Sequence, residues 1–300
     1  MMLWSIRDKQ LPIGERTLIM GILNVTPDSF SDGGDFLSPY LAVERGRQMV
    51  DEGADIIDVG GESTRPGAGV ISPEEEIKRV IPVIEALSGQ VEVPLSIDTT
   101  KSLVAAAALG AGAAIVNDIS ALRFDFHIAD EVAKVGAGLV LMHSRGTPAT
   151  MHRLPAVADV IGEVTHSLKS SITMAARRGV SQQYIAIDPG IGFGKSREQN
   201  LELIAKLDQI GRALPELPLV VGVSRKSFIG YLLADETGEP ALVEARVHGT
   251  MAAIAASILN GANIVRVHDV KTAVETGSAC LRGGPSGRPV SASQRQRRCP

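Results

Sequence analysis

Aromatic side chains are scarce in this chain of 300 residues, where Phe, Trp and Tyr together make up 3%. Proteins that hold single-stranded nucleic acid usually stack bases on aromatic rings and line the phosphates with positive charge. Positive charge is also in short supply, because 34 acidic residues outnumber 30 lysines and arginines and the net charge is −4. The composition therefore argues against a nucleic-acid partner.

Cysteines and long apolar runs are also few. Cys280 and Cys299 are the two cysteines of the chain, and they cannot build a disulfide framework or a Cys-x-x-Cys motif. Apolar runs such as Met251–Ala256 are far shorter than the roughly 18 residues that a membrane span needs. The N-terminal segment carries charged residues where a signal peptide would be apolar. We therefore expect a cytoplasmic protein with no membrane partner.

Short apolar runs alternate with longer segments of helical periodicity along most of the chain. The runs lack polar alternation, which is typical of parallel strands covered on both faces. Ser72-Pro73-Glu74-Glu75 begins one helical segment, with a capping serine, a proline in the first turn and a glutamate placed to close a capping box. The predicted strands are Leu18–Leu23, Ile56–Val59, Leu95–Ile97, Ala114–Val116, Leu139–Met142, Ile185–Ile187, Leu219–Val221 and Ile264–Val267. Further predicted helices cover Leu41–Glu52, Ala156–Arg178, Glu198–Leu214 and Ala241–Leu259.

Eight strands, each followed by a helical segment, predict a (β/α)8 TIM barrel in a single domain. The barrel would cover residues 15–281, after a lead-in of residues 1–14. Residues 282–300 are rich in Gly, Ser, Pro, Gln and Arg and predict a disordered basic tail, whose removal should leave activity intact. A doubly wound open sheet is the alternative architecture.

The predicted strands end in polar residues. In a barrel of this class the carboxyl ends of the strands converge on one face, and function lies there. Any one Asp or Asn could simply cap the following helix. The set as a whole instead predicts a polar cavity, which a ligand or mutual pairing must satisfy. The residues at or just after the strand ends include Asn24, Glu62, Asp98, Asn117, Asp118, His143, Asp188, Lys226, Arg266 and His268.

Asp98, Asn117 and Asp188 suit a flat heterocycle rich in N–H donors, because a carboxylate can accept two parallel N–H bonds. Arg266 and His268 lie two residues apart and suit a phosphate or diphosphate, although a structural ion pair of Arg266 is the alternative. Asn24 could offer its oxygen to a hard cation. The Ser227 hydroxyl could add an anion contact at the start of a helix.

One further glycine-rich segment only partly matches a known motif. Gly190–Ser196 resembles a P-loop, but the first glycine of that motif is replaced by Pro189. We therefore expect a loop lying against the ligand rather than a nucleotide cradle. His143 follows a strand and could be structural or functional, whereas His248 falls within a helical segment and is expected to be structural.

Seven segments, taken in order, resemble the motifs of one enzyme family, the dihydropteroate synthases, and the likeness covers roughly residues 15–280. The segments are Met20–Gly34 (MGILNVTPDSFSDGG), Asp58–Gly67 (DVGGESTRPG), Ser96–Thr99 (SIDT), Asn117–Ile119 (NDI), Asp188–Lys195 (DPGIGFGK), Ser224–Phe228 (SRKSF) and Arg266–Asp269 (RVHD).

The resemblance implies a transferase of folate biosynthesis that condenses 6-hydroxymethyl-7,8-dihydropterin diphosphate with 4-aminobenzoate and releases pyrophosphate. It implies that Asp188 accepts the amino-pyrimidine edge of the pterin. Asp98, Asn117 and Lys226 would bind the rest of the ring, and Arg266 would pack over its face. The resemblance implies catalytic roles for Asp98, Lys226, Arg266 and His268.

The resemblance also implies how the second half of the site is built. Asn24, Arg266 and His268 would bind the diphosphate, with Mg2+ as cofactor at Asn24. The remaining residues implied to bind substrate are Phe30, Thr64, Arg65, Pro66, Met142, Phe193, Gly222 and Ser227, of which Phe30, Pro66 and Ser227 would frame the aminobenzoate together with Lys226.

A pterin-binding methyltransferase barrel is the main alternative, because it would share the Asp/Asn/Asp cradle but needs no diphosphate site. A non-catalytic pterin-binding subunit is a second alternative. Sulfonamides mimic aminobenzoate and are expected inhibitors, and the sequence is compatible with a sensitive and with a resistant enzyme. The resemblance implies a homodimer, and the alanine-rich segment around Met251–Ile258 could pack on the partner.

Overall fold

The structure is a computed structural model that describes residues 2–26, 37–63 and 69–283. Within these ranges eight parallel strands form one sheet in the order β8-β7-β6-β5-β4-β3-β10-β9. A further parallel bridge joins Ile187 in β8 to Leu219 beside β9, so the two ends of the sheet meet. The predicted (β/α)8 barrel is confirmed, and this closure excludes the open sheet. The strands are β3 (Leu18–Asn24), β4 (Ile56–Gly60), β5 (Leu95–Asp98), β6 (Ile115–Asp118), β7 (Gly138–Met142), β8 (Ile185–Asp188), β9 (Val220–Val221) and β10 (Ile264–Val267).

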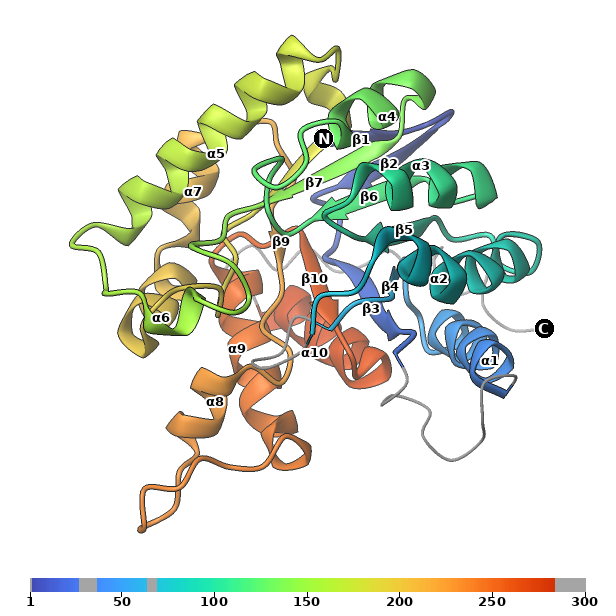
Figure 1. The fold of residues 1–300 in the computed structure, drawn as a ribbon. Helices are drawn as coiled ribbons and strands as arrows, with labels where there is room; N and C mark the ends of the chain where they lie inside the picture. Colours follow the sequence, from blue (N-terminus) through green and yellow to red (C-terminus); the bar gives the residue numbers. More distant parts are fainter. Residues whose placement is uncertain (1, 27–36, 64–68, 284–300) are drawn as a thin grey trace.

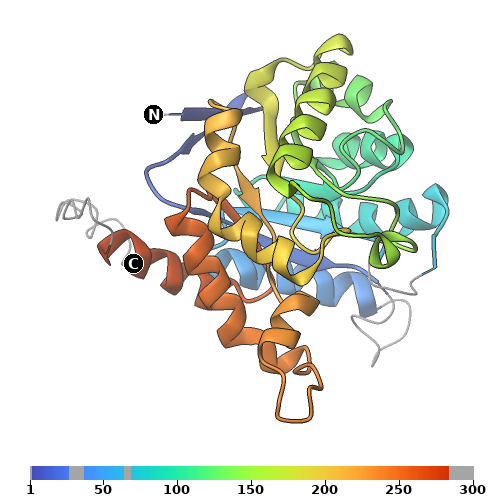
Figure 2. The ribbon, with the colours of Figure 1, turned by 90° about the vertical axis from the view of Figure 1, so that its left-hand side faces the viewer.

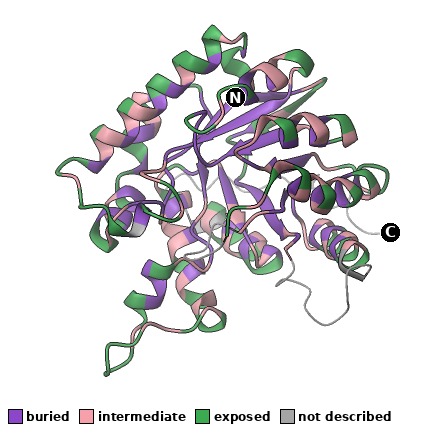
Figure 3. Ribbon diagram, viewed as in Figure 1, coloured by how far each residue is buried: buried purple, intermediate pink, exposed green. Residues whose placement is uncertain are grey.

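Helices surround the barrel and cover the outer faces of its strands (Figure 1), while Figure 3 shows the strands buried at the centre. They bury Val, Ile, Leu and Ala side chains against the outward residues of the strands, which is the main hydrophobic contribution to the fold. The helices are α1 (Leu37–Asp51), α2 (Pro73–Ser88), α3 (Ser102–Ala111), α4 (Ile128–Val135), α5 (Val160–Arg177), α6 (Arg197–Ala205), α7 (Leu207–Ala213), α8 (Ser227–Leu232), α9 (Val247–Leu259) and α10 (Val270–Gly283).

The helix boundaries differ from the predicted ones in several places. Ser72 caps α2 as predicted, with its Oγ accepting from the Glu75 amide at 3.2 Å. The Glu75 side chain pairs with Arg79 instead of closing a capping box. The segment predicted as one helix over 198–214 is interrupted at Lys206 between α6 and α7. The helices predicted to begin at 156 and 241 begin at Val160 and Val247.

Residues 2–13, within the predicted lead-in, form an antiparallel hairpin of β1 (Met2–Ile6) and β2 (Lys9–Ile13). Trp4 is completely buried, and its indole N–H donates to the Tyr184 carbonyl at 2.9 Å. Trp4, Ile6 and Ile13 pack against apolar residues of seven barrel strands. The hairpin therefore covers the end of the barrel at which the strands begin.

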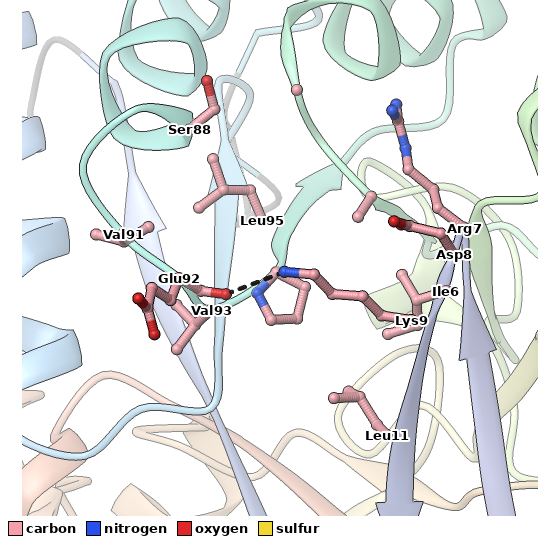
Figure 4. Close-up of a pocket in the computed structure, with 13 residues that line it drawn as sticks. Ile6, Arg7, Asp8, Lys9, Leu11, Ser88, Val91, Glu92, Val93 and Leu95 are labelled. Carbon is pink, nitrogen blue, oxygen red and sulfur yellow. Dashed lines mark hydrogen bonds between the residues drawn. The ribbon is translucent and has the colours of Figure 1, made fainter.

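A groove of about 170 Å³ lies beside this hairpin, at the same end of the barrel. Figure 4 shows Lys9, the first residue of β2, reaching toward the segment that leads into β5, where its ammonium donates to the Glu92 carbonyl. This groove is at the opposite end from the strand carboxyl ends, so it is separate from the predicted site.

The segment around α8 extends away from the barrel in two perpendicular views (Figures 1 and 2). It carries exposed apolar side chains at Leu232, Leu233 and Leu242. Among the described residues, no helix has both the length and the apolar character needed to cross a membrane.

Candidate active site

The polar residues of the site form the second layer of side chains inside the barrel. The first layer is apolar and contains Met20, Ile56, Ile115, Val140, Ala186, Val220 and Ile264. Side chains two residues apart on a strand point to the same face. Two positions further along the same strands come Ile22, Asp58, Asn117, Met142, Asp188, Gly222 and Arg266. The alternation along each strand therefore places the site directly above an apolar layer of the core.

Arg266 lies at the centre of this layer. Its Nε lies 2.6 Å from Asp58 Oδ2, and its second guanidinium nitrogen lies 2.6 Å from Asp98 Oδ2. Asn117 Nδ2 also donates to Asp58 Oδ2, at 3.0 Å. The alternative prediction for Arg266 was an ion pair with a neighbouring acid. Arg266 does form such pairs, and one of its partners, Asp98, is itself a predicted substrate-binding residue.

Asp98 is held in an environment that favours its protonated form. Burial raises the pKa of its carboxyl to about 7, with Arg266 opposing the shift and the charge of Asp58 adding to it. β5 carries Asp98 beside Asn117 of β6 and Gly60 of β4. A carboxyl group that titrates near neutral pH is typical of a binding site, where the polar groups of a ligand replace the water that would otherwise solvate the carboxylate.

Asp188 ends β8 and is almost fully buried. Its Oδ1 accepts from the Gly190 amide at 2.6 Å. Burial raises the pKa of Asp188 to about 6, against the lowering effects of that bond and of Lys226. A Cβ built on Gly222 would lie 4.0 Å from Asp188 Oδ2 and 3.8 Å from Arg266 Cβ. Gly222 therefore keeps side-chain volume away from the space between the two charged groups.

Lys226 brings a second cation to the site from the segment after β9. Its Nζ lies 4.0 Å from the centre of the Phe193 ring. Burial and the charge of Arg266 lower the pKa of Lys226 to about 8, while Asp188 and Asp98 oppose the shift. Lys226 is therefore charged at neutral pH but close to its titration range. Ser227, the next residue, begins α8 and is exposed.

His268 follows the end of β10, and its Nδ1 lies 2.9 Å from Ser224 Oγ. Burial, together with the charges of Arg266 and Arg225, lowers the pKa of His268 to about 3. The imidazole is therefore neutral at pH 7. An anion bound here would be attracted by the positive charges of Arg266 and Lys226, not by His268.

Asn24, Met142 and Phe193 lie around this centre. Asn24 ends β3, and a Cβ built on Gly60 would lie 3.8 Å from its Oδ1 and 3.9 Å from Asp98 Oδ2. Met142 and Phe193 form a small apolar cluster with Ile119 and Met151. The site thus has an apolar wall beside its carboxylates, which suits a flat ring with a polar edge. Phe30, Thr64, Arg65 and Pro66 lie outside the described residues.

Two residues of the structure extend the predicted site. Asp58 was not among the predicted site residues. The sequence does contain a sign of its role, because it is a charged residue inside an otherwise apolar strand. Lys195, which lies in the segment that resembles a P-loop, donates to two backbone carbonyls rather than facing an open phosphate site. His143 is buried beside it, and burial together with Lys195 lowers the pKa of His143 to about 2.

Comparisons with known proteins agree on one kind of enzyme. A family profile described as "Pterin binding enzyme" matches residues 20–268. The dihydropteroate synthase of Synechocystis is 48% identical over 86% of this chain and 87% of its own length. The solved structure of Xanthomonas albilineans dihydropteroate synthase with 4-aminobenzoic acid is 41% identical, has a TM-score of 0.85 and covers 94% of this chain and 99% of its own. The Yersinia pestis dihydropteroate synthase in a sulfonamide drug complex is 40% identical, with a TM-score of 0.84, over 93% of this chain and 98% of its own.

Proposed function

The chain belongs to the dihydropteroate synthase family of pterin binding enzymes, and from this premise we propose how its barrel carries out the reaction. The family predicted from the sequence motifs is confirmed, and so is the transferase activity. The enzyme joins 4-aminobenzoate to 6-hydroxymethyl-7,8-dihydropterin diphosphate and forms 7,8-dihydropteroate and pyrophosphate. The observation that carries the proposal is that Arg266 pairs with Asp98 and Asp58. Asn117 donates to Asp58, and the charge of Asp188 lies close by.

In this proposal the carboxylate of Asp188 recognises the pterin by hydrogen bonds. Asp188 Oδ1 is taken by the Gly190 amide, and Oδ2 faces the space that Gly222 leaves open, where it can accept N–H bonds from the amino-pyrimidine edge. Asn117 and Lys226 bind the rest of the ring. Phe193 and Met142 supply the apolar wall against one part of the heterocycle.

Bond exchange takes place at the methylene carbon of the pterin. Its C–O bond to the diphosphate breaks, and a C–N bond to the aniline nitrogen forms. That nitrogen loses a proton to solvent, and pyrophosphate leaves. Arg266 and Lys226 stabilise the negative charge of the departing diphosphate, while a charged Asp98 stabilises positive charge on the ring and methylene. His268 is neutral at pH 7, so it offers the diphosphate a hydrogen bond but no positive charge.

We propose Mg2+ as the cofactor, held by Asn24. Asn24 Oδ1 and Asp98 Oδ2 both lie within 4 Å of the position that a Cβ on Gly60 would take, at 3.8 and 3.9 Å, and oxygen atoms of this kind suit the ion. Among the described residues, no group of three or more His, Cys, Asp or Glu side chains could hold a metal. This fits Mg2+, which commonly takes few protein ligands and several oxygens from substrate phosphates and water. When bound, the ion would neutralise charge on the diphosphate.

The Mg2+ proposal is tested by titrating the metal. Replacing Asn24 by Ala removes one ligand oxygen, which we expect to weaken Mg2+ binding by roughly 1.4 kcal/mol. The Mg2+ concentration for half-maximal rate should therefore rise about tenfold. Asn260→Ala is the matched control, because Asn260 caps a helix and bonds to the Ala256 carbonyl. An unchanged metal dependence in Asn24→Ala would overturn the assignment.

One assay separates the proposed function from its alternatives. Purified protein is mixed with the pterin diphosphate, with and without 4-aminobenzoate, and dihydropteroate and pyrophosphate are measured. Equal amounts of both products support the synthase. A methyltransferase barrel or a non-catalytic pterin-binding subunit would bind the pterin without forming dihydropteroate.

We also propose that the enzyme is a cytoplasmic homodimer that sulfonamides inhibit by competing with 4-aminobenzoate. The exposed Leu232, Leu233 and Leu242 around α8, with Leu259 at the end of α9, offer apolar surface for a second copy. Light scattering should give twice the chain mass of 31.6 kDa, and a monomer mass would overturn the dimer. The response of the apparent KM for 4-aminobenzoate to a sulfonamide distinguishes a sensitive from a resistant enzyme.

A further inference from the structure

The ammonium of Lys195 bonds to two loops at once. Its Nζ donates to the carbonyl oxygen of His143 at 3.0 Å and to that of Gly190 at 2.7 Å. His143 belongs to the segment after β7, whereas Gly190 belongs to the segment after β8. Two of the three donors of the ammonium are therefore used within the protein, although the surrounding segment resembles a phosphate-binding loop.

Both residues that accept from Lys195 also donate to Asp188. The His143 amide donates to the Asp188 carbonyl at 2.9 Å, and the Gly190 amide donates to Asp188 Oδ1 at 2.6 Å. Lys195 thus closes a circuit of four hydrogen bonds that runs through the backbone of two residues, His143 and Gly190, and holds the main chain and the side chain of Asp188.

The circuit is tightly packed and requires glycine at position 190. Gly190 has a φ of +67°, and a Cβ there would lie 1.8 Å from the His143 carbonyl oxygen and 3.0 Å from Lys195 Nζ. No side chain fits this space without moving the two loops apart. The positions of the carbonyl groups, and with them the direction of the Asp188 carboxylate, are therefore coupled to the Lys195 ammonium.

We propose that Lys195 is a positioning residue for pterin recognition, which acts by holding the carboxylate of Asp188 in the direction that the heterocycle needs. The role rests on the proposed function, in which Asp188 accepts the pterin edge. Lys195 itself does not touch the substrate. Its removal should weaken the pterin site selectively and leave the aminobenzoate site, built from other segments, unchanged.

The test compares Lys195→Met with Lys134→Met, a control at an exposed Lys that pairs with Glu131 on α4. Lys195→Met should raise the KM for the pterin diphosphate about tenfold, as expected when two hydrogen bonds that orient a charged group are lost. Its KM for 4-aminobenzoate should stay within about twofold of wild type. Lys134→Met should change neither constant.

A purely structural role would lower the melting temperature of Lys195→Met while leaving both KM values unchanged, or would raise the two KM values equally, and either result overturns the proposal. If Lys195→Met does not fold, Lys195→Gln keeps an amide donor at this position and is expected to show the same selectivity with a smaller, about threefold, change. Wild-type turnover in the same assay tests the proposed function separately. If the wild-type rate is normal and the pterin KM is unchanged in Lys195→Met and Lys195→Gln, the role of Lys195 is rejected while the proposed function stands.

Discussion

Asp58 holds the guanidinium of Arg266, with Asp58 Oδ2 at 2.6 Å from Arg266 Nε. Asp58 is completely buried, and the same oxygen accepts from Asn117. Asp98 accepts from another nitrogen of the guanidinium. Two carboxylates on different strands therefore fix the orientation of the cation that the proposed mechanism uses for the diphosphate.

Asp58→Asn should weaken both folding and catalysis. The substitution removes the charge of one of the two carboxylates that pair with the buried Arg266 guanidinium, and we expect the free energy of unfolding to fall by about 3 kcal/mol. kcat/KM for the pterin diphosphate should fall at least about tenfold because Arg266 is no longer fixed. Urea denaturation and steady-state kinetics measure the two effects. Asp208→Asn, which breaks an exposed pair with Arg212, is the control, and equal effects in the two variants would contradict the role of Asp58.

Asp188→Asn should reduce pterin affinity about 100-fold, because charge-assisted hydrogen bonds to the heterocycle become neutral ones. The amide oxygen of Asn can still accept from Gly190, so the melting temperature should change little. Calorimetric titration with 7,8-dihydropteroate measures the affinity. An affinity equal to that of wild type would show that the pterin edge is read elsewhere.

The pH dependence of kcat/KM for the pterin diphosphate should be bell-shaped. Asp188 and Asp98 have pKa values of about 6 and about 7 and act as carboxylates, so activity rises with pH through this range. Lys226 has a pKa of about 8 and acts as an ammonium, so activity falls above that pH. A pH-rate profile from pH 5 to 9 checks both limbs, and a flat profile between pH 6 and 8 would contradict the assignment.

The same carboxyl groups give an opposite trend for stability. Their pKa values in the folded chain lie above the unfolded value of about 4, so the folded state binds more protons between pH 4 and 7. The free energy of unfolding of the substrate-free protein should therefore decrease as pH rises through this window. Denaturation at several pH values separates this effect from the activity profile.

Much of the barrel was predictable because each strand combines an apolar run with a polar end. Asp98, Asn117 and Asp188 illustrate this, since each ends or nearly ends its strand and each lies in the site. Asp58 was harder to find, because it is two residues from the end of β4 and its role depends on Arg266, which is 208 positions away. Such a pairing follows from barrel closure, which the local sequence does not specify.

The N-terminal hairpin shows a different limit of sequence reasoning. Two-residue hairpin turns usually contain Gly or Asn, which tolerate positive φ. Here the turn contains Arg7 with a φ of +53°, and its amide donates to the Gly136 carbonyl. The turn is stabilised by this contact with the segment between α4 and β7, so its local residues give no hairpin signal.

Lys101→Met should destabilise the fold without changing the pterin site. The Lys101 ammonium lies 2.8 Å from Glu62 Oε2 and 2.5 Å from Glu76 Oε2, and the Glu76 side chain is 1% exposed. Without the cation a buried carboxylate is unpaired, and we expect a loss of about 3 kcal/mol in the free energy of unfolding. Adding Glu76→Gln should recover part of this loss. No recovery in the double variant would argue against a charge effect.

Pyrophosphate release should precede attack by 4-aminobenzoate. The aniline nitrogen is a weak nucleophile. In the proposed mechanism Arg266 and Lys226 supply positive charge for the leaving group, and the ionised carboxyl of Asp98 stabilises the cation left on the pterin. We therefore expect slow pyrophosphate release from the pterin diphosphate alone, with water as the acceptor, and a lower rate of this partial reaction in Asp98→Asn. A coupled pyrophosphate assay without aminobenzoate measures it. If release depends strictly on aminobenzoate, bond breaking and attack are concerted, and the charge of Asp98 then serves to bind the ring rather than to stabilise a free cation.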